Sequence, residues 1–250
     1  MKTTCKFRIF SFLFFILVFT LNYGCTDPVD KPDGSSLGTV KDKDGNVYKT
    51  IKIGSQVWMA ENLKSTKYNN GTEIINVTSN IQWTNLTTGA YCNYENLESN
   101  SAKYGRLYNW YAVNTGKLAP AGWRVPTDED WTVLVNYLIA KGYNYDGTKD
   151  INKIAKSLAA TTDWTTSTYI GAVGNDLSIN NSIRFTALPG GFRYNDGSFE
   201  SIGSVGVWWC STEYNTSYAW FRDLYYYNNF IDRGNENKNC GFSVRCVKDL

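Results

Sequence analysis

Aromatic and amide side chains late in the chain are the residues best suited to contact a ligand. Tryptophan and tyrosine rings stack on sugar rings or on peptide side chains, while amides and arginine provide directional hydrogen bonds. The pattern therefore predicts a site that binds a surface glycan or a protein. Its candidate residues are Trp208, Trp209, Trp220, Arg222, Tyr225, Tyr226, Tyr227 and Asn228.

Trp208 and Trp209 are neighbours in a predicted strand, and this limits how many of the two rings can be buried. Successive residues of a strand face opposite sides of the sheet, so at most one of the two rings belongs to a core face. The other ring then needs a partner or a ligand. The alternative interpretation is that neighbouring loops cover both rings.

Histidine is absent from the 250 residues, which narrows the possible chemistry. Its absence excludes Ser-His-Asp and Cys-His nucleophiles, histidine general bases and His-ligated zinc or copper sites. We expect no catalytic residue, no metal and no other cofactor. The segment 42–46, Asp-Lys-Asp-Gly-Asn, is similar to the front of a calcium loop. Its glycine comes early and no glutamate closes it, so we expect a simple turn.

The charge balance argues against a nucleic-acid partner. The full chain carries 25 basic and 23 acidic side chains, a formal net charge of +2. Lys2, Lys6 and Arg8 lie in the first 24 residues, and without them 25 − 3 = 22 basic side chains face 23 acidic ones. A near-neutral chain without a basic run lacks the electrostatic footprint of a nucleic-acid binder.

The N-terminus has the pattern of an export signal. Three basic residues precede an uncharged apolar run over 9–21, which is shorter than the ~20 residues of a membrane-spanning helix. Gly24 directly before Cys25 is similar to a bacterial lipoprotein signal, although Asn22 stands where leucine is usual. We expect a lipoprotein-type signal peptide over 1–24 and lipidation of Cys25. An ordinary cleaved signal and an uncleaved anchor are the alternatives.

The segment that follows, 25–37, is expected to be a flexible tether. It is rich in Asp, Pro, Gly and Ser and has little apolar surface to bury. The whole chain is 42% hydrophobic and 16% aromatic, which is enough for one sizeable core. We therefore expect a single domain over 38–250, held at the bacterial outer membrane or cell surface by its lipid anchor alone.

One helix is predicted with clear boundaries, over 127–141. Thr127 can cap its first turn, and the three acidic residues that follow meet the positive end of the helix dipole. Lys141-Gly142 supplies a cation and a glycine at the other end. Between them, one apolar stripe recurs at helical spacing through Trp131, Leu134, Val135 and Leu138.

A second helix is predicted over 151–160, with Asp150 as its cap, and these two are the helices we expect with well-defined bounds. The aromatic segment 104–113 is expected to form a short buried helix or turn. Strands are expected on either side of turns at 42–46, 54–55 and 195–197, and over 206–211, 218–224 and 242–247. The last of these alternates as a half-buried strand does, whereas 225–239 is expected to be a long loop.

The helix start resembles that of formylglycine-generating-enzyme-like domains, which have a C-type-lectin-like fold. That resemblance lies in Trp-Arg-Val-Pro-Thr-Asp-Glu-Asp-Trp over 123–131. A closer resemblance is to the Fibrobacter succinogenes major paralogous domain family, which carries no established activity. It covers about residues 38–249 and rests on segments 44–48, 58–63, 104–113, 188–192 and 241–246.

The resemblance implies an α+β fold. In a C-type-lectin-like domain of this kind, two helices pack on antiparallel strands that are joined by long irregular loops. The export signal and the late aromatic residues, taken with this fold, predict an exported, lipid-anchored binding or adhesion module for a carbohydrate or a protein. A structural surface paralogue without a fixed small-molecule ligand is the alternative. No catalytic activity is expected.

Four cysteines remain in the domain once Cys5 leaves with the signal and Cys25 carries lipid: Cys92, Cys210, Cys240 and Cys246. In an exported domain, four cysteines predict two disulfides with three possible connectivities. The resemblance to lectin-like folds implies the pairs Cys92–Cys246 and Cys210–Cys240. Many relatives have a further cysteine where this chain has Ala119.

A copper-dependent oxidase is the remaining alternative, because the formylglycine-generating relatives oxidise a substrate cysteine at a paired-cysteine copper site. Cys240 and Cys246 are the only close pair in this chain. On an extended strand they would stand about 20 Å apart at ~3.3 Å per residue, which is too far to share one metal ion. The sequence therefore disfavours this activity.

Overall fold

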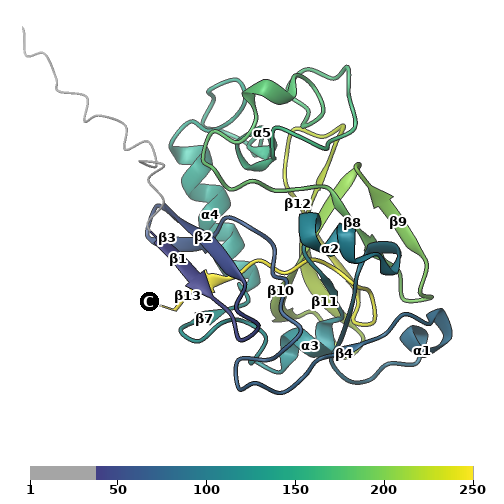
Figure 1. Cartoon of the computed structure of the whole chain (residues 1–250). Helices are drawn as coiled ribbons and strands as arrows, with labels where there is room; N and C mark the ends of the chain where they lie inside the picture. Colours follow the sequence, from purple (N-terminus) through teal and green to yellow (C-terminus); the bar gives the residue numbers. More distant parts are fainter. Residues whose placement is uncertain (1–37, 250) are drawn as a thin grey trace, which may run out of the picture. The chain divides into compact units, whose positions relative to one another are not determined.

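Antiparallel strands organise residues 38–249, the part of the chain that this computed structural model describes (Figure 1). The predictions of a signal peptide over 1–24, lipidation at Cys25 and a tether over 25–37 lie outside the described residues. Within them, the structure is mostly β with short helices, an arrangement compatible with the α+β class. None of its helices is long and apolar enough to cross a bilayer.

The first sheet contains the earliest and the latest strands of the described chain, in the order β1-β2-β3-β13-β7. Both predicted N-terminal hairpins are confirmed, with turns at 42–46 and 54–55. Ile51 and Ile53 share the buried face of β2, as their alternation predicts. The strands are β1 Gly38–Lys41, β2 Val47–Ile53, β3 Gln56–Met59, β7 Trp123–Arg124 and β13 Val247–Lys248.

Asp42 closes the first turn, which confirms a simple turn at the segment that is similar to a calcium loop. Its carboxylate accepts from the backbone N–H groups of Asp44 (3.0 Å) and Asn46 (2.9 Å) and from the hydroxyls of Tyr48 and Ser65 (2.6 Å each). Burial opposes the charge, but these hydrogen bonds hold the pKa of Asp42 below its ordinary value. The carboxylate thus ties the hairpin to the segment after β3.

The second sheet has the order β12-β11-β10-β8-β9 and forms the predicted late meander. The hairpin at 195–197 joins β8 to β9, and β8 runs parallel to β10. The expected long loop over 225–239 is wrong in part, because 232–237 pairs with β11 residue by residue. The strands are β8 Gly190–Arg193, β9 Phe199–Ile202, β10 Val205–Glu213, β11 Tyr218–Tyr225 and β12 Asp232–Asn237.

A small third sheet joins β4 Ile75–Asn76, β5 Ala90–Cys92 and β6 Leu107–Tyr108.

Helix α4, Asp128–Ala140, confirms the helix predicted from capping and apolar spacing. The Thr127 hydroxyl accepts from the Asp130 N–H (3.1 Å), and the Asp130 carboxylate accepts from the Thr127 N–H (2.7 Å), which completes a capping box. Lys141 is the C-cap, and Gly142 follows with φ of 77°. The apolar stripe is buried, and Trp131 lies 4.9 Å from Trp58 between ring centroids.

The second predicted helix is much shorter than expected: α5 covers only Ala155–Leu158, and Ile154 rather than Asp150 occupies its N-cap. The Asn144 amide explains the difference. It donates to the carbonyl of Ile151 (2.7 Å) and accepts from the N–H of Lys153 (2.9 Å), so these backbone groups do not join a helix.

The expectation of two well-defined helices is also wrong. Three more are present: α1 Asn80–Thr84, α2 Glu98–Tyr104 and α3 Trp110–Asn114. The last confirms a short buried helix in the aromatic segment. Two 3-10 turns, Tyr94–Asn96 and Leu177–Ile179, complete the helical elements of residues 38–249.

The segment 242–247 is extended and paired, but it is not the half-buried strand that its alternation predicts. Every residue in it is buried, and only Val247 belongs to a regular strand. Its backbone pairs with several segments in turn, through Tyr108, Val207, Trp209, Leu63 and Met59. Because protein surrounds it on all sides, both faces of this segment belong to the core.

Candidate functional site

Trp208 and Trp209 lie on opposite faces of β10, and both are enclosed by protein. Their exposed fractions are 1% and 0%. The Trp208 indole N–H donates to the side-chain oxygen of Asn62, and that of Trp209 to the carbonyl of Tyr108, both at 2.8 Å. Both are therefore core residues, and the prediction that one of them needs a ligand is corrected. The sheet has apolar residues packed on both of its faces.

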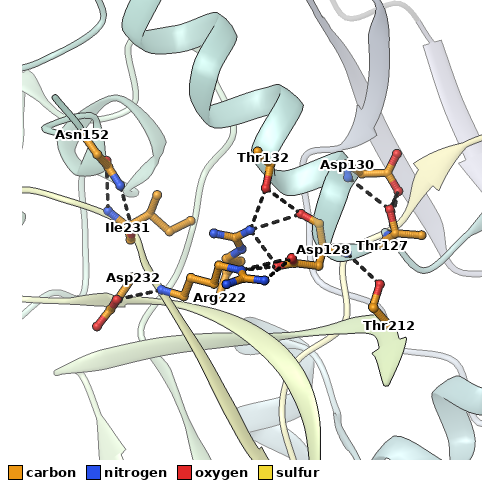
Figure 2. Close-up of polar contacts among 10 residues, drawn as sticks. Thr127, Asp128, Asp130, Thr132, Asn152, Thr212, Arg222, Ile231 and Asp232 are labelled. Atoms are coloured by element: carbon orange, nitrogen blue, oxygen red, sulfur yellow. Dashed lines mark hydrogen bonds and ion pairs between the residues drawn. The ribbon is translucent and has the colours of Figure 1, made fainter. Parts of the chain in front are cut away.

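Arg222 and Trp220 are predicted ligand residues that the structure uses internally. The Arg222 guanidinium, directed at the first turn of α4 in Figure 2, donates to the carboxylate of Asp128 at 2.7 Å. Arg233 contacts the same carboxylate and lies 3.5 Å above the Trp220 ring. The Tyr214 ring packs edge-on against Trp220, with the two centroids 4.9 Å apart. These contacts fasten α4 to the sheet and leave little of Trp220 for a partner.

The three tyrosines after β11 have different environments. Tyr225 and Tyr226 are half-buried and pack against different core clusters. Tyr227 contacts both of their rings, with centroids at 5.3 and 5.1 Å, and is itself 44% exposed. Tyr227 is therefore the tyrosine of the three that presents the largest surface to a partner.

Tyr227 and Asn228 line a surface hollow of about 240 Å³ that a second loop completes. We name it the aromatic hollow. Ile170 is 81% exposed and Tyr169 is 69% exposed, although large apolar side chains are usually buried. The other lining residues are Ala172, Asn229 and Phe230.

Backbone hydrogen bonds hold the two loops of the aromatic hollow together. The N–H of Val173 donates to the carbonyl of Asn228 (2.9 Å), and that of Gly174 to the carbonyl of Tyr226 (2.7 Å). A Cβ on Gly174 would lie 2.1 Å from the carbonyl oxygen of Thr165, so only glycine fits here. These contacts fix the backbone of the two loops, which we call the frame of the hollow.

The buried side chain of Lys156 holds the loop that carries Tyr169 and Ile170 from the interior of the protein. It is almost fully buried, and its ammonium donates to the carbonyls of Ala172 and Asp176 (3.1 Å each) and to that of Asn175. Burial lowers the pKa of Lys156 from its ordinary value. The cation is thus a shared donor to three carbonyls of the loop, two of which also accept a backbone N–H, from Asn175 and Ile179.

Sequence reasoning did not select Tyr169 and Ile170. The signal that could have identified them is a pair of large apolar residues within a run of small and polar ones, just before Gly171. Their closeness to Tyr227 depends on long-range pairing of loops, which the local sequence does not encode.

All four cysteines of the domain are free thiols, which corrects the predicted disulfides Cys92–Cys246 and Cys210–Cys240. The partners of each predicted pair lie in different core clusters. Burial raises the pKa of the Cys92 and Cys210 thiols to about 12 and raises those of Cys240 and Cys246 as well. These side chains behave as small apolar core residues.

Comparison with known proteins gives one result for the family and none for an individual relative. The family model described as Fibrobacter succinogenes major domain matches residues 51–248. No curated protein and no solved structure matches the chain.

Proposed function

The chain belongs to the Fibrobacter succinogenes major domain family, and we propose that it is a surface module that binds a partner protein through the aromatic hollow. The proposal rests on one observation: Tyr169, Ile170, Tyr227 and Phe230 are exposed together around a hollow whose frame is fixed. A rigid frame lowers the entropy lost on binding. Clustered exposed apolar side chains are typical of interaction sites.

The chemistry of the aromatic hollow favours a protein over a glycan. The exposed aromatic rings of the hollow suit either partner, whereas Ile170, its most exposed apolar residue, is a branched aliphatic side chain that a protein partner would bury. Asn228 and Asn229 add amides at its border. An apolar centre with polar groups at the rim is the usual composition of a protein interface.

The proposed location is the bacterial outer membrane or cell surface, with the chain exported and anchored through lipid on Cys25. The basic residues, the apolar run over 9–21 and the glycine before Cys25 support it. We also propose a C-type-lectin-like fold. The capped helix α4, packed against the late strands, supports that assignment.

We propose no catalytic activity for this chain. A paired-cysteine copper site must be open to its substrate, whereas the side chains of Cys240 and Cys246 are fully buried. Both side chains also pack inside an apolar cluster. These observations weigh against the oxidase alternative.

Site-specific photo-crosslinking in the producing bacterium tests the proposal. A photoreactive residue in place of Tyr227 should give a defined protein adduct, and Ile170→Asp in the same chain should abolish it. The same residue in place of Tyr218, an exposed tyrosine at the other end of β11, is the matched control and should give no such adduct.

Two other outcomes would overturn the proposal. If no adduct forms and a glycan array instead shows binding that Ile170→Asp removes, the aromatic hollow is a glycan site. If neither assay shows binding, the chain is a structural surface paralogue. Because Ile170 is mostly exposed, its substitution tests binding rather than folding.

A further inference from the structure

We infer that a second pocket, at the opposite end of β11, binds an uncharged sugar ring. This amide pocket encloses about 220 Å³ and is separate from the aromatic hollow. Ser217 precedes β11 and Tyr227 follows it, and the eight residues of the strand span about 26 Å at ~3.3 Å per residue. Its polar lining residues are Thr84, Asn195, Thr216, Ser217, Asn237 and Asn239.

The lining of the amide pocket is polar but carries no charge. Each sugar hydroxyl both donates and accepts hydrogen bonds, and amide and hydroxyl side chains offer both functions. A phosphate or carboxylate ligand would need a cation that the lining does not supply. The ammonium of Lys238, which lies between Asn237 and Asn239 in the sequence, is buried and already paired with Glu213 at 2.6 Å.

The orientations of two amides in the pocket are fixed by protein contacts. The Asn237 side-chain oxygen accepts from the N–H of Asn239 (2.9 Å), and the Asn239 side-chain nitrogen donates to the carbonyl of Thr84 (2.9 Å). Among the residues that the structure describes, neither the nitrogen of Asn237 nor the oxygen of Asn239 has a hydrogen-bond partner, so both are available to a ligand. One is a donor and the other an acceptor, which suits a hydroxyl group.

The turn between β10 and β11 forms a rigid wall of the amide pocket. The Lys238 ammonium donates to the carbonyl of Thr216 (2.9 Å), and the Lys238 N–H donates to that of Ser217 (3.0 Å). The Asn215 side chain accepts from the N–H of Ser217 (2.9 Å). Within residues 38–249, the hydroxyls of Thr216 and Ser217 have no hydrogen-bond partner of their own.

The turn between β8 and β9 forms another wall and carries Asn195. A Cβ on Gly197 would meet the Cα of Asn80 at 2.6 Å, so this turn packs closely against the start of α1. The Asn195 amide makes no side-chain hydrogen bond within the described part of the chain. It is therefore free to contact a ligand from a fixed backbone.

Tyr111 gives the amide pocket its one aromatic side chain, and it is half-buried on helix α3. The surface of the pocket is mostly polar, so hydrogen bonds to hydroxyls and amides, rather than stacking on this ring, would hold a sugar. The volume is smaller than the roughly 300–1,000 Å³ of pockets for drug-sized ligands. One sugar ring therefore fits better than an extended chain.

Ligand-detected NMR with the full-length chain in detergent tests this inference. The probes are methyl glycosides of glucose, galactose, mannose and N-acetylglucosamine, with glucuronate and glucose 6-phosphate as charged counterparts. At least one neutral glycoside should bind saturably and the charged sugars should bind more weakly. Asn195→Ala and Thr216→Val should each weaken binding by roughly three- to tenfold, as expected for one lost hydrogen bond.

Asn228→Ala in the aromatic hollow is the matched control and should leave sugar binding unchanged. Ser217→Trp, at an exposed position, should fill the amide pocket and abolish binding while the melting temperature is retained. The inference is overturned if no neutral glycoside binds, if charged sugars bind equally well, or if the pocket variants bind like the parent chain. Because Ile170→Asp does not alter this pocket, the two proposals can fail independently.

Discussion

Arg222 and Arg233 lie directly opposite each other on β11 and β12, and both donate to the carboxylate of Asp128. Two guanidinium groups in such a cross-strand pair would repel each other without a shared anion. Asp128 supplies that anion from the first turn of α4, where the helix dipole also favours negative charge. One side chain therefore joins the helix to two strands.

Asp128→Asn is expected to destabilise the protein by about 2–4 kcal/mol. Arg222 is only 5% exposed, and the substitution would leave its buried charge without a carboxylate. Urea unfolding measures the change in free energy. Asp146→Asn, which removes an ion pair at the surface, is the control and should cost far less. Equal losses in the two variants would contradict the proposed coupling of helix and sheet.

Stability is expected to fall as pH rises from about 4 to about 7 through the titration of Asp223. Burial and the facing Asp232 raise the pKa of Asp223 to about 7, against an ordinary value of 3.8. Between these values the folded protein holds a proton that the unfolded chain has lost, so deprotonation costs folding free energy. The buried Oδ1 of Asp223 has no hydrogen-bond partner within 38–249, which adds to this cost.

Asp223→Asn isolates this effect from that of the other carboxylates. The variant should gain about 1–3 kcal/mol relative to the parent chain at pH 8, less at pH 5 and little at pH 3, because its amide does not titrate. Chemical unfolding across that pH range measures the difference. A difference that stays constant with pH would show that Asp223 is ionised in the folded state throughout.

Lys156→Met is expected to loosen the loop that carries Tyr169 and Ile170. The change keeps most of the buried stem but removes the ammonium from three carbonyls, at a cost of about 1–3 kcal/mol. Hydrogen exchange should accelerate at Val173 and Gly174, and the crosslink from position 227 should weaken. Lys149→Met, at an exposed lysine, is the control. Unchanged exchange at both amides would rule out this supporting role.

The four domain thiols are expected to be unreactive in the folded protein and fully reactive after unfolding without reductant. Burial shields them and raises their pKa values, so thiolate is scarce at neutral pH. Alkylation followed by peptide mass spectrometry identifies each site. Disulfide-linked peptides, or fewer than four alkylated sites among these cysteines, would show instead that the cysteines form disulfides.

The sequence predicted the elements whose determinants are local. The capping box, apolar stripe and terminal glycine of α4 all lie between Thr127 and Gly142, and the hairpins at 54–55 and 195–197 depend on a few turn residues. Predictions failed where a distant group intervened. The Asn144 amide binds the backbone that would have begun the longer second helix, and β12 exists only because β11 lies beside it.

The candidate site was predicted only in part, because contacts between distant parts of the chain determine which side chains are exposed. Burial of Trp208 and Trp209 depends on the two core clusters that the sheet separates, and alternation along one strand cannot show that both faces are covered. Tyr227 and Asn228, which were predicted as ligand residues by type, line the aromatic hollow, but Tyr169 joins them only through loop pairing. The residue types indicated a surface site, and tertiary contacts determined its members.

The extended run 242–247 occupies the middle of the domain although it follows, along the chain, every segment with which it pairs. This run makes backbone hydrogen bonds with four separate parts of the chain, around Met59, Leu63, Tyr108 and Val207. The interior of the domain is therefore complete only when this run is in place. A variant that lacks residues 242–247 would lose the central strip of its interior and should not reach the native fold, although every helix and all but one strand lie before this run.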